Sequence, residues 1–84
     1  WKFFEDAFNN ADQNFLKNLK KLHPNLTRND LKLCAYLRLN LSTKEIAPLF
    51  GISVRSVEIK RYRLRKKMNL NHTTTLTDHI VSIS

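Results

Sequence analysis

The chain has 84 residues and a formal net charge of +8, with one glycine, two prolines and one cysteine. This length allows one small domain, and the few turn residues favour helices with short connections over β-hairpins, so the predicted class is all-α. One cysteine and three scattered histidines exclude a disulfide framework and a zinc site, and no apolar run approaches the ~20 residues of a membrane span. We find no nucleophile–base pair, carboxylate pair or glycine-rich phosphate loop, so we expect no catalytic residues, cofactor, metal or small-molecule ligand.

Residues 1–25 form a predicted N-terminal helical segment. Its apolar residues recur at alternating three- and four-residue steps, at Phe4, Phe8, Ala11, Phe15, Leu19 and Leu22. This spacing fits one long helix or two. Because Asp12 is a good N-cap, we favour two helices, over about 2–9 and 13–22, ending before Pro24. The aromatic residues among the first eight positions either cover the core of the domain or form a seam with a second subunit.

The next helix is predicted from Arg28 to about Leu39. Thr27 and Asp30 have the spacing of a capping box, in which each side chain accepts a hydrogen bond from the other residue's backbone N–H. Apolar residues lie on more than one side of this helix. It is therefore the expected scaffold of the bundle. Cys34, within its apolar stretch, is interpreted as a small core residue in a reducing compartment.

Two helices separated by a tight turn follow. Ser42 and Glu45 repeat the capping-box spacing at the start of a short helix. Gly51 falls where a helix ends in the left-handed conformation that glycine adopts at low cost. Ser53 can cap a longer helix over 54–69. A short helix, a glycine-containing turn and a second helix are typical of a helix-turn-helix unit.

The longer helix is predicted to bury one side and expose a basic side. At about 100° per residue, Val57, Leu64 and Met68 share the core-facing side. The opposite side has Arg55, Ile59, Tyr62 and Lys66, flanked by Glu58 and Arg63. The helix also contains Lys60, Arg61, Arg65 and Lys67, and its seven cations less Glu58 give +6 of the total charge of +8. This charge and the exposed apolar and aromatic residues favour a nucleic-acid partner.

A last helix is predicted over Thr75–Ile83, with Leu76, Ile80 and Ile83 on one face. Nine helical residues are not stable in isolation. This helix must therefore pack on the domain, on a second copy, or on both.

From Leu26 through Leu70 the sequence resembles the DNA-binding domain of the LuxR/GerE family of bacterial transcription regulators. The matching residues are Leu26-Thr27, Asp30, Ser42 to Ala47, Ile52-Ser53, Val57 and Lys66 to Leu70. The resemblance implies a helix-turn-helix domain over 26–84 with a four-helix core, which binds double-stranded DNA and regulates transcription. It further implies the output domain of a longer sensor regulator, of two-component type, and the start of the chain at Trp1 is consistent with a fragment.

The resemblance also implies roles for individual residues. It implies base contacts by Glu58, Ile59 and Tyr62, and phosphate contacts by Thr43, Lys44 and Ser56. With the 54–69 helix in a major groove, we also expect Arg55 to face the bases, and Arg63, Lys66 and Lys67 to face phosphates. The last helix is expected to join a homodimer on DNA through Leu76, Ile80 and Ile83. The sequence departs from the family pattern at Glu58, which either accepts from a cytosine amino group or orients Arg55 or Arg61. It departs again at Lys60, where histidine is common, and at Asn40, where glycine is frequent.

Two other functions remain open from the sequence. A basic helix also suits an acidic protein partner such as RNA polymerase, or an anionic membrane surface. The domain is expected in the cytoplasm, whether or not the full-length regulator is anchored in a membrane.

Overall fold

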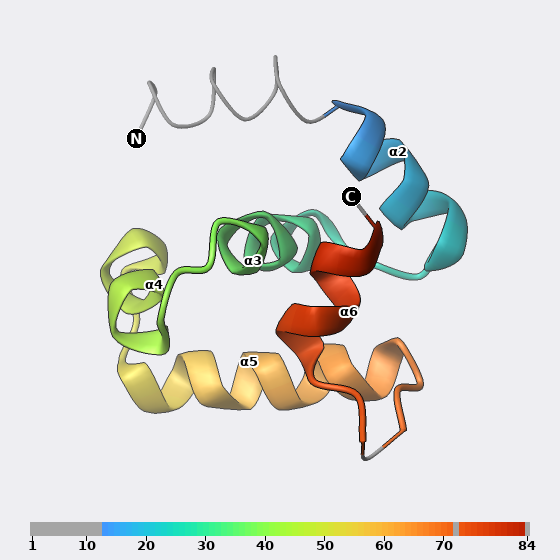
Figure 1. Ribbon diagram of the computed structural model, residues 1–84. Coiled ribbons are helices and arrows are strands. Elements are labelled where there is room, and N and C mark those ends of the chain that lie inside the picture. Colours follow the sequence, from blue (N-terminus) through green and yellow to red (C-terminus); the bar gives the residue numbers. More distant parts are fainter. Residues whose placement is uncertain (1–12, 72, 84) are drawn as a thin grey trace.

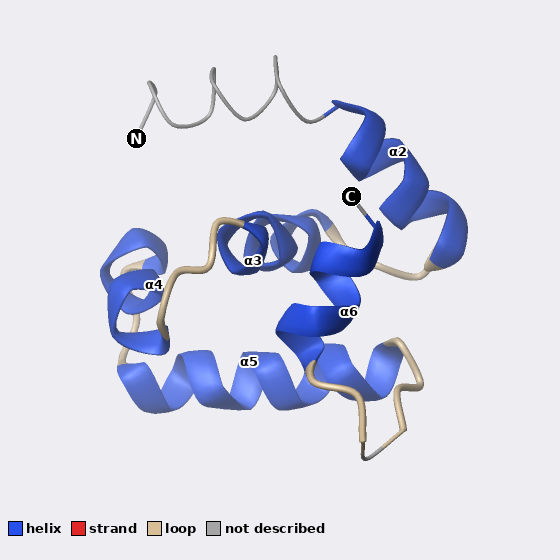
Figure 2. Cartoon of the chain, viewed as in Figure 1, coloured by secondary structure: helices blue, strands red, loops and turns tan. Residues whose placement is uncertain are grey.

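The computed structural model describes residues 13–71 and 73–83, which form five α-helices joined by short loops (Figure 1). The helices are α2 (Gln13–Leu22), α3 (Arg28–Arg38), α4 (Thr43–Phe50), α5 (Val54–Lys67) and α6 (Leu76–Ile83). The described residues contain no strand (Figure 2), so the predicted all-α class is confirmed. The helix expected over 2–9 and the aromatic residues of the first eight positions lie outside the described residues.

The α3 helix lies in the middle of the bundle (Figure 1) and has five buried residues, which agrees with its predicted role as the scaffold. In Figure 1, α5 runs along one side of the molecule, with α4 at one of its ends and α6 nearer the other. The closest helix pairs are α4 with α5, α3 with α6, and α2 with α6. None of the described helices is long and apolar enough to cross a bilayer.

The predicted helix starts are confirmed by their hydrogen bonds. Asp30 N–H donates to Thr27 Oγ1 (3.2 Å) and Thr27 N–H donates to the Asp30 carboxylate (2.9 Å), which completes a capping box at α3. Ser42 and Glu45 form the same pair of bonds at α4, with the same distances. The bonds from the Ser42 backbone and side chain lower the pKa of Glu45. At α5, Ser53 Oγ accepts from the backbone N–H three residues later (3.1 Å).

Three helices end in the same way, each with a residue in the left-handed conformation. These residues are Asn40 (φ 61°), Gly51 (φ 68°) and Asn69 (φ 54°). The backbone N–H of the following residue donates to a carbonyl five residues earlier in each case: Leu41 to Tyr36 (3.2 Å), Ile52 to Ala47 (3.1 Å) and Leu70 to Arg65 (3.4 Å). This is the Schellman motif, in which asparagine can replace glycine. It explains why asparagine is accepted at position 40.

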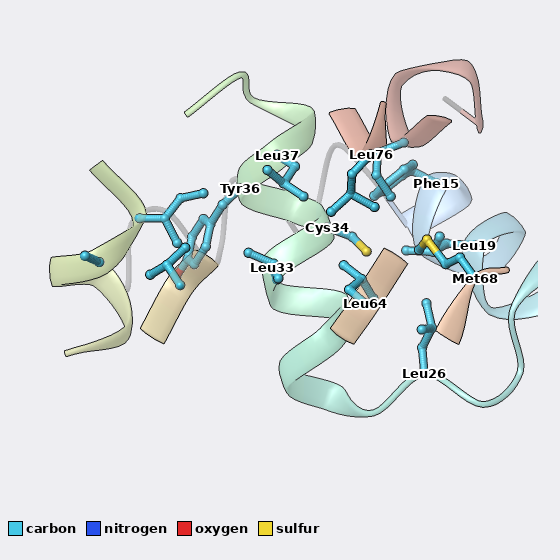
Figure 3. Close-up of a cluster of buried hydrophobic side chains, with 14 residues drawn as sticks. Phe15, Leu19, Leu26, Leu33, Cys34, Tyr36, Leu37, Leu64, Met68 and Leu76 are labelled. Carbon is cyan, nitrogen blue, oxygen red and sulfur yellow. The ribbon is translucent and has the colours of Figure 1, made fainter. Parts of the chain in front are cut away.

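The core contains residues from every described helix (Figure 3). Its members are Phe15, Leu19, Leu26, Leu33, Cys34, Tyr36, Leu37, Ile46, Ala47, Val57, Leu64, Met68, Leu76 and Ile80. The Tyr36 ring packs edge-on against Phe50, with ring centroids 5.4 Å apart. Cys34 is fully buried in this core, as predicted, and its burial, with the nearby charge of Asp30, raises the pKa of its thiol to about 12.

The apolar face of α6 packs on the domain, which is one of the arrangements that the sequence left open. Leu76 and Ile80 were expected to join two copies of the chain, but both are buried in the core of a single copy, and Ile83 packs against that core. A helix of eight residues needs its apolar face buried to be stable, and here Leu76 and Ile80 bury that face against the core of the same chain. The exposed large apolar side chain on α6 is Val81, at 51%.

The α2 helix docks on the domain through apolar and polar contacts. Phe15 and Leu19 are buried in the shared core, and Lys20 Nζ donates to the Leu26 carbonyl (2.8 Å). The Nε2 atoms of His23 and His79 lie 3.0 Å apart, which links the end of α2 to α6. Burial, and secondly the charge of His79, lower the pKa of His23. Residue spacing does not predict this contact, because the two histidines are 56 positions apart in the chain.

Candidate nucleic-acid interface

The α4 and α5 helices, with the turn Gly51–Ser53 between them, form the predicted helix-turn-helix unit. The core-facing side of α5 is as predicted, since Val57, Leu64 and Met68 are all buried. The helix ends at Lys67, two residues earlier than expected, because Asn69 adopts the left-handed conformation. The buried stripe therefore fixes which side of α5 points away from the bundle.

The opposite side of α5 is exposed and combines apolar, aromatic and charged groups. Ile59 is 41% exposed and Tyr62 is 59% exposed, and Arg55 and Glu58 are exposed beside them. These are the four residues predicted to contact bases. Within residues 13–71 and 73–83, no ion pair joins Glu58 to Arg55 or Arg61, so its carboxylate is open to an external donor.

Three of the six residues predicted to contact phosphates are exposed cations that form no ion pair within the described residues: Lys44, Arg63 and Lys66. The side chains of Lys44 and Arg63 make no hydrogen bond or ion pair with the rest of the described chain. Lys66 Nζ lies 4.9 Å from the centroid of the Tyr62 ring, which places this cation beside a residue predicted to contact bases.

The other three predicted phosphate ligands have partners within the chain. Thr43 Oγ1 accepts from Arg61 Nη1 (3.1 Å), and Ser56 Oγ accepts from Ser53 Oγ (3.0 Å). Lys67 Nζ lies 2.5 Å from Asp30 Oδ2 and joins the end of α5 to the start of α3. Lys67 therefore supports the fold.

The Lys67–Asp30 pair is supported by its effect on the carboxyl group. Burial by itself raises the pKa of Asp30, but hydrogen bonds from Lys67 and Thr27 outweigh burial and hold the pKa below its ordinary value. The carboxylate is thus charged at neutral pH and serves both the α3 capping box and the contact with α5.

Three more cations of α5 contact neighbouring parts of the chain, which the sequence analysis missed. Lys60 Nζ lies 5.6 Å from the centroid of the Phe50 ring of α4. Arg61 contacts Thr43 at the start of α4. Arg65 donates one N–H to the Thr74 carbonyl and another to the Asn71 carbonyl, and so holds the loop that leads to α6.

The helical angle could have identified these internal contacts. Lys60, Arg61, Arg65 and Lys67 all lie within about 80° of the buried stripe, where long side chains reach along the neighbouring elements. Arg55, Arg63 and Lys66 lie farther round, on the exposed side. Counting charge along the helix did not separate these two groups.

A helix-turn-helix with one buried stripe and an opposite exposed face of mixed chemistry is the architecture of a DNA-binding domain. A family model described as GerE, bacterial regulatory proteins, luxR family, matches residues 24–80, more than half of the chain. The chain therefore belongs to the LuxR family of bacterial regulatory proteins, as its motifs predicted, and the match extends into α6. Comparisons with curated proteins and with solved structures found no match.

Proposed function

We propose that this domain binds a specific sequence of double-stranded DNA through α5 and so regulates transcription, as the output domain of a longer cytoplasmic or membrane-anchored regulator. The observation that carries the proposal is the exposure of Ile59 and Tyr62 on the side of α5 opposite its buried stripe. An apolar and an aromatic side chain among cations cost solubility without contributing to the core. They fit a surface that reads base edges in a major groove.

The residues of this face suit different features of a base pair. Arg55 can donate to guanine acceptors, Glu58 can accept from a cytosine amino group, and Ile59 can contact a thymine methyl group. Lys44, Arg63 and Lys66 are exposed, and we expect them to neutralise phosphates on either side of the bases. Phosphate contacts contribute affinity for any sequence, whereas the base contacts discriminate among sequences.

We further propose that two copies bind half-sites about one helical turn apart. Since Leu76 and Ile80 are buried within each copy, the proposed pairing uses the exposed side of α6, which includes Val81. RNA polymerase is a further proposed partner of the assembled pair.

Selection of bound duplexes from a random pool at stated salt tests the proposal. The parent domain should enrich one sequence. Ile59→Ala and Tyr62→Ala should each relax the preference at one base position, at a cost of about 1–3 kcal/mol. Lys66→Gln should weaken binding to all sequences alike. Enrichment of no sequence would contradict specific DNA binding. Binding of an acidic protein that excess DNA does not displace would favour the alternative function, a protein-interaction module.

A further inference from the structure

Arg61 belongs to α5 but lies on a different side from the residues proposed to contact DNA. It is about 40° from buried Val57 around the helix, and its side chain is half-buried. Its Nη1 atom donates to Thr43 Oγ1 of α4 at 3.1 Å. This arginine therefore connects the two helices of the helix-turn-helix unit.

We propose that Arg61 is a positioning residue: it fixes the orientation of α5 on α4, and thereby the base preference, without touching DNA. The inference rests on the proposed function, because it concerns how the base-contacting face is held. It assigns to Thr43 a role within the protein in addition to its predicted phosphate contact.

The directional nature of the contact supports this role. Apolar packing between α4 and α5 opposes their separation, but it is non-directional and leaves small rotations of α5 inexpensive. A guanidinium donates along fixed directions in its plane, so a hydrogen bond from it restricts the relative orientation of the two helices. A change in the orientation of α5 relative to α4 would move Ile59 and Tyr62 relative to the base edges.

The contact also has a counterpart at the other end of α4. Thr43 is the first residue of α4 and Phe50 is the last, and Arg61 contacts the first while Lys60 Nζ lies over the ring of the last. Two neighbouring cations of α5 thus hold α4 at both ends. Contacts at both ends of α4 fix its direction relative to α5, whereas a single contact would let α4 rotate about that contact.

Thr43 can hold α5 and bind DNA at once. A hydroxyl group accepts through its lone pairs and donates its own proton, so accepting from Arg61 leaves that proton for a phosphate oxygen. A phosphate bound there would be in fixed register with the bases that α5 contacts. Arg61 therefore couples the backbone contact of α4 to the base contacts of α5.

The test compares Arg61→Gln with Arg63→Gln, a matched control that removes the same charge from the exposed side of α5. Affinity for the selected half-site and for single-mismatch duplexes is measured over a range of salt concentrations. Arg61→Gln should lower the ratio of the affinity for the selected half-site to the affinity for a mismatched duplex about three- to tenfold, the equivalent of one hydrogen bond. Its salt slope should equal that of the parent. Arg63→Gln should keep the ratio and lower the slope by about 0.9, the effect of one lost phosphate contact.

Thr43→Val removes the acceptor without changing charge. It should reduce the ratio as Arg61→Gln does, and the double variant should lose no more than either single variant. If thermal unfolding shows that Arg61→Gln is not folded, Arg61→Lys replaces it and should combine the parent slope with a reduced ratio.

Two outcomes would overturn the inference. A salt slope reduced by about one unit in Arg61→Gln, with an unchanged ratio, would make Arg61 a phosphate ligand. A ratio and slope equal to the parent in Arg61→Gln or Arg61→Lys would show that the contact does not position α5. Failure of the proposed function itself is distinct, since the parent domain would then prefer no duplex at all.

Discussion

Ile80 and Val81 are neighbours on α6 with opposite environments, and replacing each by alanine tests the burial of this helix. Ile80 is fully buried, whereas Val81 is 51% exposed. Ile80→Ala removes packing from the core that α3 and α6 share. Val81→Ala removes two methyl groups from the surface and improves helix propensity slightly.

The expected magnitudes differ widely. An isoleucine-to-alanine change in a packed core costs about 2–5 kcal/mol, from lost burial and from the cavity that remains. At ~0.05–0.15 kcal/mol per residue, a domain of this length has only about 4–13 kcal/mol of unfolding free energy in total. Ile80→Ala should therefore remove a large part of the stability, while Val81→Ala should change it by less than about 0.5 kcal/mol.

Urea unfolding followed by far-UV circular dichroism measures both changes, and Ile80→Val, expected to cost about 0.5–1.5 kcal/mol, keeps the series within the folded range. Analytical ultracentrifugation on a duplex with two half-sites then compares pairing. Val81→Glu should weaken the pairing at unchanged stability. Equal stability losses for Ile80→Ala and Val81→Ala would refute the assignment of Ile80 to the core and restore α6's apolar face as a surface for a partner.

Three other changes have definite expected outcomes. Lys67→Gln breaks the ion pair between α5 and α3, so it should lower the unfolding free energy by up to about 1 kcal/mol and leave the salt slope of DNA binding unchanged. Lys66→Gln should instead lower that slope by about 0.9. The reverse result would make Lys67 the phosphate ligand. The lowered pKa of His23 means that the unfolded chain binds a proton more readily, so stability should fall as pH decreases below about 6.5. Thermal melts of His23→Gln should lose this part of the pH dependence, and a parent-like dependence would contradict its origin in His23. Gly51→Ala should cost about 1–2 kcal/mol from the positive φ alone, since its Cβ would meet no atom within 4 Å; an unchanged melting temperature would contradict the left-handed assignment.

Local chemistry made much of the fold predictable. The cap at Thr27 depends on side chains three residues apart, and so does the cap at Ser42. The helical angle separated the buried stripe of α5 from Ile59 and Tyr62. These features involve neighbours in the chain, so residue spacing contains the information that they require.

The partners of the cations on α5 were decided by tertiary structure. Lys66 and Lys67 are adjacent and chemically identical, yet Lys67 pairs with Asp30, 37 positions away, and Lys66 does not. The difference arises because α3 lies beside only one of them once the core has formed. A sequence shows which residues are charged, but it does not show which neighbour will be within reach.

The tertiary structure also determines which surface the apolar face of α6 covers. The sequence by itself determined that this helix has one apolar face and is too short to be stable alone. It left open whether that face covers the domain or a second copy, because both arrangements bury the same side chains. The folded chain buries Leu76 and Ile80 against its own core, since α3 already offers an apolar surface there.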